Sequence, residues 1–231
     1  MTMTTSGTYA FGPSVGELML NAFGRIQIRR TEITQQHLAD AANEANFVQV
    51  EMSNRLPNLW LSETYTVSLS QGTADYTLPA RLIAPMAVYL TIASGSNSTD
   101  RILVPISTFE YASLPNKTTQ GQPTSYWFDR QESPIFHLWP VPDGNATYTL
   151  NLRMVSQPQD AKAPNGLAPE FPYRFLDAFA AALAARLAVI YKPELEDKRK
   201  ADAERAWTIA ATQDQEDVPM FVAPQLGQYW R

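Results

Sequence analysis

The sequence predicts an α+β fold in which helices from both ends of the chain form a bundle, and an antiparallel β region of hairpins and a meander is inserted between them. Two changes of hydrophobic period and one unusual C-terminal stretch predict this arrangement. Apolar residues recur with helical spacing in both end regions, but in the middle they alternate with polar residues, as in strands. We expect a flexible arm over residues 1–13, a helical bundle from 14–61 and 168–217, a β insert over 62–167 and an extended tail over 218–231.

The composition excludes several classes of protein. Of the 231 residues, 45% are hydrophobic and 18% are charged, so the chain can bury a core. The net charge of −5 argues against a protein that holds nucleic acid by neutralising phosphates. Because the chain has no cysteine and only His37 and His137 could supply imidazole, we expect no thiol nucleophile and no metal site. We find no membrane span, secretory signal or cofactor fingerprint, and expect neither membrane association nor a cofactor.

Two helices are expected before the β insert. Ser14 can cap a short helix that runs to about Phe23, where Gly24 interrupts it. Thr34 opens a second helix, whose apolar stripe continues until Pro57 ends it. The two helices therefore supply the N-terminal half of the bundle.

Charged and titratable residues of this region have a plain interpretation. His37 lies in the first turn of the second helix, and we interpret it as a surface or capping residue. A basic cluster lies between the helices, and we interpret it as part of a solvated linker. The alternative is contact with an acidic partner or with DNA phosphate. The cluster consists of Arg25, Arg29 and Arg30.

The β insert begins where the period changes to two. Residues 65–69 alternate between apolar and polar, and a partner strand starts at Tyr76. A hairpin follows, with one strand over residues 87–92, a polar turn over 95–100 and a return strand over 101–106.

The stretch Gln122–Val155 predicts a β-meander with one buried face. Ile135–Trp139 is a short apolar strand, and Asp143–Asn145 is a strong turn signal. In the last strand, alternate residues point to the same side. These residues are Tyr148, Leu150, Leu152 and Met154. Before the meander, Ser107 begins a single helical turn.

Two helices are expected after the β insert. Pro172 precedes an alanine-rich helix, and Pro193 ends it and begins a last helix that runs to about Gln213. The alanines allow neighbouring helices to approach closely. The first of these helices carries an apolar stripe of Leu176, Phe179, Leu183, Leu187 and Ile190.

The C-terminal segment Val218–Arg231 has its own composition. Pro219 and Pro224 exclude a regular helix, yet most of the segment is apolar. Segments of this kind dock on their own domain or on a partner, and both alternatives stay open. The candidate partner-binding residues are Met220, Phe221, Val222, Leu226, Tyr229, Trp230 and Arg231.

No catalytic motif is present. The carboxylates of the β region that could form the acid/base pair of a glycosidase are Glu110, Asp129 and Glu132, and we interpret them as surface charges because nothing in their spacing brings them to one cleft. His137 lies between two apolar residues of a strand, with no Ser/Asp arrangement near it in sequence. We therefore expect no catalytic, cofactor-binding or metal-binding residues.

The order of these features resembles the head-to-tail adaptor, or connector, proteins of tailed bacteriophages over about residues 14–217. The resemblance is carried by VSLSQGTADYTLP, by LVPISTFEYASLP, by the long stretch SYWFDRQESPIFHLWPVPDGNATYTLNLRMV and by the alanine-rich helix. Its most specific parts are Ile106–Pro115, Gly121–Tyr126 and Ile135–Leu152.

The resemblance implies a non-enzymatic virion protein of the neck that is made in the host cytoplasm. Such proteins form rings, typically dodecamers, that bind beneath the portal protein and extend the DNA channel. They also provide the platform for the tail nozzle or tail-tube protein, and DNA passes through their lumen during genome ejection without specific binding. For this chain, we expect contacts to the next subunit or the tail first at the loops Asn116–Pro123 and Pro142–Asn145.

Two other functions fit the same sequence less well. A cell-wall-hydrolysing virion component would use two of the three carboxylates in one cleft. A module that binds a host receptor or a glycan would use exposed Trp127 and Trp139. The positions of these side chains in the fold distinguish the alternatives.

Overall fold

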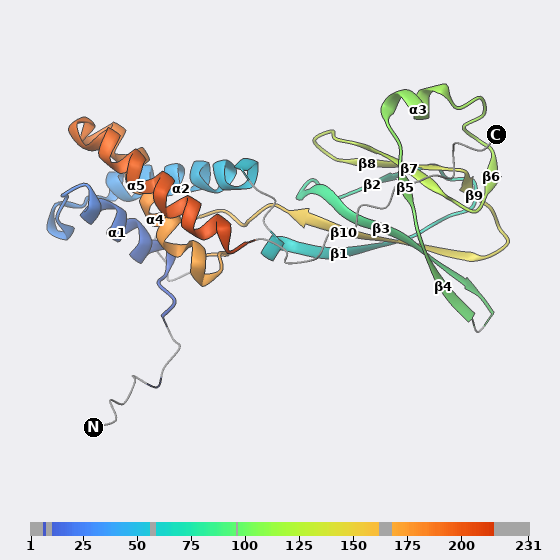
Figure 1. The fold of residues 1–231 in the computed structure, drawn as a ribbon, viewed down its shortest axis with the longest axis horizontal. Helices are drawn as coiled ribbons and strands as arrows, with labels where there is room; N and C mark the ends of the chain where they lie inside the picture. Colours follow the sequence, from blue (N-terminus) through green and yellow to red (C-terminus); the bar gives the residue numbers. More distant parts are fainter. Residues whose placement is uncertain (1–6, 8–10, 56–58, 96, 162–167, 215–231) are drawn as a thin grey trace. The chain divides into compact units, whose positions relative to one another are not determined.

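The computed structural model describes residues 7, 11–55, 59–95, 97–161 and 168–214 (Figure 1). The chain divides into two compact units. One contains residues up to Glu44 and from Phe171 onwards, and the other contains residues 45–162 and 168–170. The first unit is helical and the second consists mainly of antiparallel sheet, which confirms the predicted α+β class. The residue bounds that we expect for the four parts stay a prediction.

The helical unit is built around helix α4. Its helices are α1 (Val15–Arg25), the first part of α2 (Gln35–Arg55), α4 (Leu176–Tyr191) and α5 (Glu196–Thr212). Helix α4 packs against both α1 and α5. Short 3-10 turns over residues 30–32, 173–175 and 193–195 precede α2, α4 and α5.

Helix α4 is buried on most of its surface, and not along one stripe. Small alanines between the large apolar residues leave room for neighbouring backbones on several sides, so Ala180 and Ala184 are as buried as Leu183. The predicted stripe is correct for its first four members, whereas Ile190 is 48% exposed because it lies in the last turn.

Local sequence signals set the helix ends. The Ser14 hydroxyl accepts a hydrogen bond from the Glu17 N–H at 3.3 Å, and the Glu17 carboxylate accepts one from the Ser14 N–H at 2.8 Å. This capping box confirms the predicted start of α1. Gly24 does not interrupt the helix, which runs one residue further to Arg25. Thr34 precedes α2 as expected.

Polar and aromatic contacts join the helices of this unit. The Arg25 guanidinium lies 2.5 Å from the Asp177 carboxylate. The Tyr191 hydroxyl donates to Asp40 at 2.5 Å, and burial together with this carboxylate raises the pKa of Tyr191 to about 12. His37 accepts a hydrogen bond from the Thr34 N–H, and its ring stacks on Tyr191 at 4.6 Å. The hydrogen bond is a capping contact, which agrees with the interpretation of His37 as a surface or capping residue. The sequence did not indicate that the ring is half-buried between aromatic neighbours.

The β unit is a sandwich of two four-stranded sheets. Sheet A has the order β1-β10-β3-β4 and is antiparallel throughout. Sheet B has the order β2-β8-β7-β5, with β5 parallel to β7. The strands of sheet A are β1 (Ser62–Ser68), β10 (Thr147–Ser156), β3 (Leu82–Ser94) and β4 (Asn97–Ile102). Those of sheet B are β2 (Asp75–Thr77), β8 (Ile135–Trp139), β7 (Ser125–Asp129) and β5 (Val104–Pro105).

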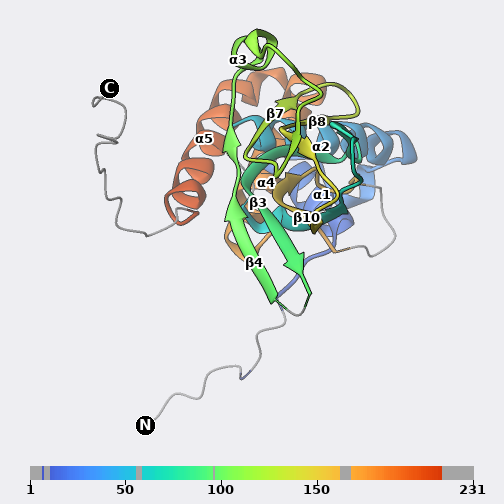
Figure 2. The ribbon, with the colours of Figure 1, turned by 90° about the vertical axis from the view of Figure 1, so that its right-hand side faces the viewer.

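Several short elements and the second part of α2, from Ala45 onwards, complete the unit. The helix α3 (Thr108–Ser113) follows β5, and the two-residue strands β6 (Gln120–Gly121) and β9 (Val141–Pro142) pair in parallel. A 3-10 turn over Leu59–Leu61 precedes β1. Within this unit, the β3–β4 ribbon and α3 project in opposite directions (Figures 1 and 2).

The inner faces of the two sheets share one core. Phe136 of β8 is fully buried and stacks on Tyr126 of β7, with ring centroids 4.8 Å apart. The predicted alternation in β10 is confirmed, because its four apolar residues face this core. The core residues are Leu78, Leu82, Val88, Leu90, Leu103, Tyr126, Phe136, Leu138, Tyr148, Leu150, Leu152 and Met154. Burial of this apolar surface stabilises the sandwich.

The predicted meander is wrong in its third strand. Strands β7 and β8 form an antiparallel hairpin, but β10 lies in the other sheet, between β1 and β3. Alternating side chains determine which residues of a strand face inward. They do not distinguish two sheets whose inner faces meet at the same core.

The first half of the insert also differs from the prediction. The partner of β1 is β10, and the strand at Tyr76 pairs with β8 instead. Strand β3 begins at Leu82 and continues past Pro85 at a register shift. Gly95, with φ of +62°, allows a tight turn in which Ser94 pairs with Asn97, so most of the expected polar turn is strand β4.

We expect Phe136→Ala to lower the free energy of unfolding by roughly 3–5 kcal/mol, because it leaves a cavity between two packed aromatic rings. Phe109→Ala is the control, since the Phe109 side chain is 81% exposed on α3, and its effect should stay within about 0.5 kcal/mol. Urea unfolding of the full chain measures both. Equal effects of the two substitutions would contradict this account of the core.

Candidate interaction surfaces

Glu110 is a helix-capping residue. Its carboxylate accepts a hydrogen bond from the Ser107 N–H at 2.7 Å, and the Ser107 hydroxyl accepts one from the Glu110 N–H at 3.1 Å. These bonds confirm the predicted helical turn after Ser107. The bond from the Ser107 N–H, and to a smaller extent the Ser107 side chain, lower the pKa of the Glu110 carboxylate. A glycosidase acid requires a raised pKa, so this carboxylate is unsuited to that role.

The other two candidate carboxylates lie at the β7–β8 connection. Asp129, at the end of β7, accepts a hydrogen bond from the Gln131 side-chain amide at 2.6 Å, and Glu132 is exposed in the connection itself. Neither lines the groove that is formed by β3, the segment 100–105 and Tyr126. Among the described residues, no group of His, Asp and Glu side chains could hold a metal ion, and no helix is long and apolar enough to cross a membrane.

An aromatic stack attaches α3 to sheet B. The rings of Trp127 and His137 lie face to face with centroids 4.4 Å apart, and Tyr111 of α3 lies 5.2 Å from Trp127. The His137 Nδ1 atom lies 2.6 Å from an Asp75 carboxylate oxygen, and Lys117 lies over the Tyr111 ring. The position of His137 in a strand left two alternatives, a residue on the solvent face or a satisfied residue partly in the core, and the structure shows the second.

Trp139 fixes the loop Asn116–Pro123. Its indole N–H donates to the Asn116 carbonyl at 3.1 Å, and the Asn116 side chain accepts from the Thr118 N–H at 2.9 Å. Trp127 and Trp139 are both half-buried and engaged within their own unit. They therefore differ from the exposed aromatic platform that a glycan-binding module would use.

The two loops singled out in the sequence lie together at one end of the sandwich. Gln120 pairs with Val141 through β6 and β9, and the Gly72 N–H donates to the Pro142 carbonyl at 2.9 Å. A Cβ atom on Gly144 would lie 3.0 Å from the Gln71 side-chain oxygen, so a larger residue there would displace the end of the Gln71 side chain. The sequence predicted each loop, but only the pairing of β6 with β9 brings them side by side.

The second of these loops is held by a buried tyrosine. The Asp143 carboxylate accepts hydrogen bonds from the Tyr148 hydroxyl at 2.7 Å and from the Asn145 side chain at 2.8 Å. These bonds lower the pKa of Asp143, whereas burial and the nearby carboxylate raise the pKa of Tyr148 to about 12. The loop therefore presents a fixed surface.

A groove beside β4 was not predicted. It has a volume of about 500 Å³ and runs between β3, the segment 100–105 and Tyr126. Ile102 and Met86, which line it, are 80% and 46% exposed, and Val104 of the same segment is 59% exposed. Apolar side chains with this exposure on a folded unit are typical of a contact surface. The pattern of apolar and polar residues over 101–106 did not indicate this groove, because the chain passes from one sheet to the other within the segment.

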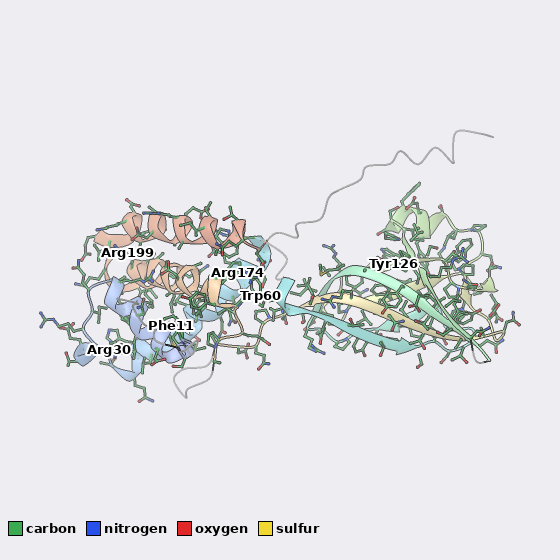
Figure 3. All side chains as sticks on the ribbon, turned by 60° about the horizontal axis from the view of Figure 1, so that its bottom comes forward. Phe11, Arg30, Trp60, Tyr126, Arg174 and Arg199 are labelled. Atoms are coloured by element: carbon green, nitrogen blue, oxygen red, sulfur yellow. The ribbon has the colours of Figure 1, made fainter. Side chains whose placement is uncertain are left out.

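The helical unit also exposes apolar side chains. Of the basic cluster Arg25, Arg29 and Arg30, it engages the first in an ion pair. Ile209 of α5 is 58% exposed. Arg25 is engaged by Asp177, whereas Arg29 and Arg30 are exposed and make no ion pair within the described part of the chain. Figure 3 shows Arg30 pointing away from the unit.

The end of α5 is tied to its unit. Asp214, whose side chain is only 4% exposed, pairs with Arg174 of the turn before α4 (Figure 3). The chain therefore leaves this unit from a fixed point. The seven candidate partner-binding residues, from Met220 to Arg231, lie outside the described residues, so their role stays a prediction.

A family model described as SU10 adaptor protein matches residues 14–224. The chain belongs to the SU10 adaptor protein family. This confirms the resemblance found in the sequence. The adaptor is also similar, at 12% identity, to a chain of a solved structure described as "Neck of empty GTA particle computed with C6 symmetry". That match covers 83% of the adaptor and 85% of the other chain, with a TM-score of 0.27. No curated protein matches the adaptor.

The capping box of α3 gives a pH prediction for the adaptor. The pKa of Glu110 should lie below its ordinary value, because the Ser107 N–H and, to a smaller extent, the Ser107 side chain favour the ionised carboxylate. Ser107→Ala should raise this pKa part of the way, because it removes the side-chain contribution and keeps the backbone N–H. A lowered pKa in the folded state stabilises α3 above the unfolded pKa, and this contribution is lost as the pH falls through the folded pKa. Carbon-detected NMR titration of the Glu110 carboxyl measures it. The Ser113→Ala chain is the control, and an unchanged pKa in Ser107→Ala would contradict the capping role.

Proposed function

We propose that this adaptor is a structural, non-enzymatic protein that assembles as a ring under the portal of a tailed bacteriophage. There it extends the DNA channel and provides the attachment platform for the tail. The observation that carries the proposal is the family match over residues 14–224. Two side chains that a hydrolase could use also support the proposal, because both make structural contacts. Glu110 caps a helix, and His137 is engaged in an aromatic stack.

The exposed surfaces suit a ring subunit. A ring closes through heterologous contacts, in which one face of a subunit meets a different face of the next. Each of the two compact units exposes large apolar side chains, such as Ile209 in one and Ile102 in the other. Dissimilar apolar surfaces of this kind can bury one another between copies.

We place the adaptor in the virion neck, after synthesis in the host cytoplasm, with twelve copies in the ring. Its further partners would be the portal protein on one side and the tail nozzle or tail-tube protein on the other. The net charge of −5 fits a lumen through which DNA slides during genome ejection without specific binding. In the chain, the bundle of 14–61 and 168–217 would form the ring body, and the insert 62–167 would make contacts.

The ring is tested by electron microscopy of the purified chain and of virions that carry it, together with the mass of the assembly in solution. We expect a closed ring of twelve copies with a central opening, or a single chain that becomes a ring only in the neck. A position at the tail tip or on a fibre would contradict the proposal. So would a specific glycan complex of the purified chain.

The tail 218–231 is proposed to bind a partner, either the portal or a neighbouring adaptor. Deleting it should leave the circular dichroism spectrum and the melting temperature nearly unchanged but prevent stable assembly, because Asp214 already ties the end of α5 to its unit. Comparison of the deleted and full chains by circular dichroism and by mass in solution measures both effects. Unfolded protein after the deletion would mean that the tail belongs to its own core.

A further inference from the structure

The segment Asn97–Pro105 forms a free edge of both sheets in the β unit. Strand β4 is the last strand of sheet A, and β5 is the last strand of sheet B (Figure 1). Leu103 lies between them in the chain. The Leu103 N–H donates to the Val88 carbonyl at 3.0 Å. Because bonded pairs alternate along an antiparallel ladder, the N–H and C=O groups of Asp100 and Ile102 point away from β3. They can therefore pair with another strand.

This edge lacks most of the usual protection. Natural edge strands avoid pairing through charged side chains, above all lysines, and through prolines, bulges or a covering element. Every residue of β4 is exposed, and the strand holds no lysine or proline. Its two charged residues, Asp100 and Arg101, have opposite signs, and Asp100 accepts a hydrogen bond from the Thr91 hydroxyl. Pro105 ends the edge only after Ile102 and Val104 have exposed their side chains. An unpaired edge next to an apolar groove is the geometry that accepts an added strand.

The C-terminal segment of the chain has matching chemistry. Met220–Ala223 is a short apolar run with strong β propensity, and prolines at 219 and 224 limit any strand to about this length. The free edge from Ser98 to Ile102 is similarly short. Apolar residues of the run fit a groove bordered by Met86 and Ile102.

Charges favour one direction of the added strand. Glu216 and Asp217 precede the apolar run, and Arg231 follows it. In an antiparallel arrangement the residues before the apolar run lie at the Ile102 end of β4, so Glu216 and Asp217 would lie towards Arg101.

We propose that Met220–Ala223 of one adaptor adds as an antiparallel strand to the free edge of β4 in a second copy, with its apolar side chains in the groove beside Ile102. The choice of a second copy, and not the same chain, rests on the proposed ring. A segment given to the neighbour is a heterologous contact, so it repeats from copy to copy until the ring closes.

Disulfide trapping tests the contact directly, because the native chain has no cysteine. An Ile102→Cys chain is mixed with a Val222→Cys chain, oxidised mildly and resolved without reductant. We expect a mixed disulfide dimer that forms about tenfold faster than with Ile83→Cys, the control, since Ile83 is exposed on the same sheet but lies outside the groove. A chain carrying both Ile102→Cys and Val222→Cys distinguishes the alternatives. A closed monomer without mixed dimers would overturn the second copy as the source, and no disulfide would overturn the docking site.

Proline substitution tests the backbone pairing. A labelled peptide of residues 215–231 is titrated against the full chain whose own segment carries Phe221→Asp. Asp100→Pro removes an outward N–H and should weaken binding about tenfold, whereas Asp100→Ala should not. The matched control is Thr66→Pro on β1, the opposite edge, where Leu69 donates to Tyr148 and the Thr66 N–H also points outward. Equal losses with both prolines would overturn pairing at β4.

Failure of this inference differs from failure of the proposed function. If electron microscopy shows rings but no mixed disulfide forms, the proposed ring is supported and the proposed strand contact is rejected. If the mixed disulfide forms and the peptide binds but no rings are found, the proposed contact is supported and the proposed ring is rejected.

Discussion

Leu103 is the residue at which the chain passes from one sheet of the sandwich to the other. Its side chain is buried in the shared core, and its N–H bonds to Val88 of sheet A, while the next N–H, of Val104, bonds to Thr124 beside sheet B. A single buried leucine thus joins the edges of both sheets. The exposed apolar side chains on either side of it follow from this crossing, because a strand that changes sheet cannot keep one face inward.

The polar residues of this protein are used to hold elements in place. Glu110 caps α3, Asp75 lies against His137, and Asp143 fixes the turn before β10 through Tyr148. Each of these groups is satisfied by a neighbour within its own unit, so it contributes rigidity and not reactivity.

Much of the fold follows from the sequence because helix ends depend on residues only three apart. Ser14 and Ser107 begin helices by capping, and Pro193 separates α4 from α5. Alternation also identified the inward side chains of β10 correctly. The adaptor family was recognisable from the order of these features, since order survives when individual residues change.

Strand partners and contact surfaces were decided only by tertiary structure. Apart from proline, every residue has the same backbone N–H and C=O groups. No local sequence pattern therefore indicates that β10 pairs with β1 and β3 instead of β8. The sequence also did not indicate that the His37 ring stacks on Tyr191, because the two residues lie far apart in the chain. The sequence by itself therefore determined where elements begin and which side chains face inward. The fold alone determined which strands are neighbours, and with them the free edge at β4.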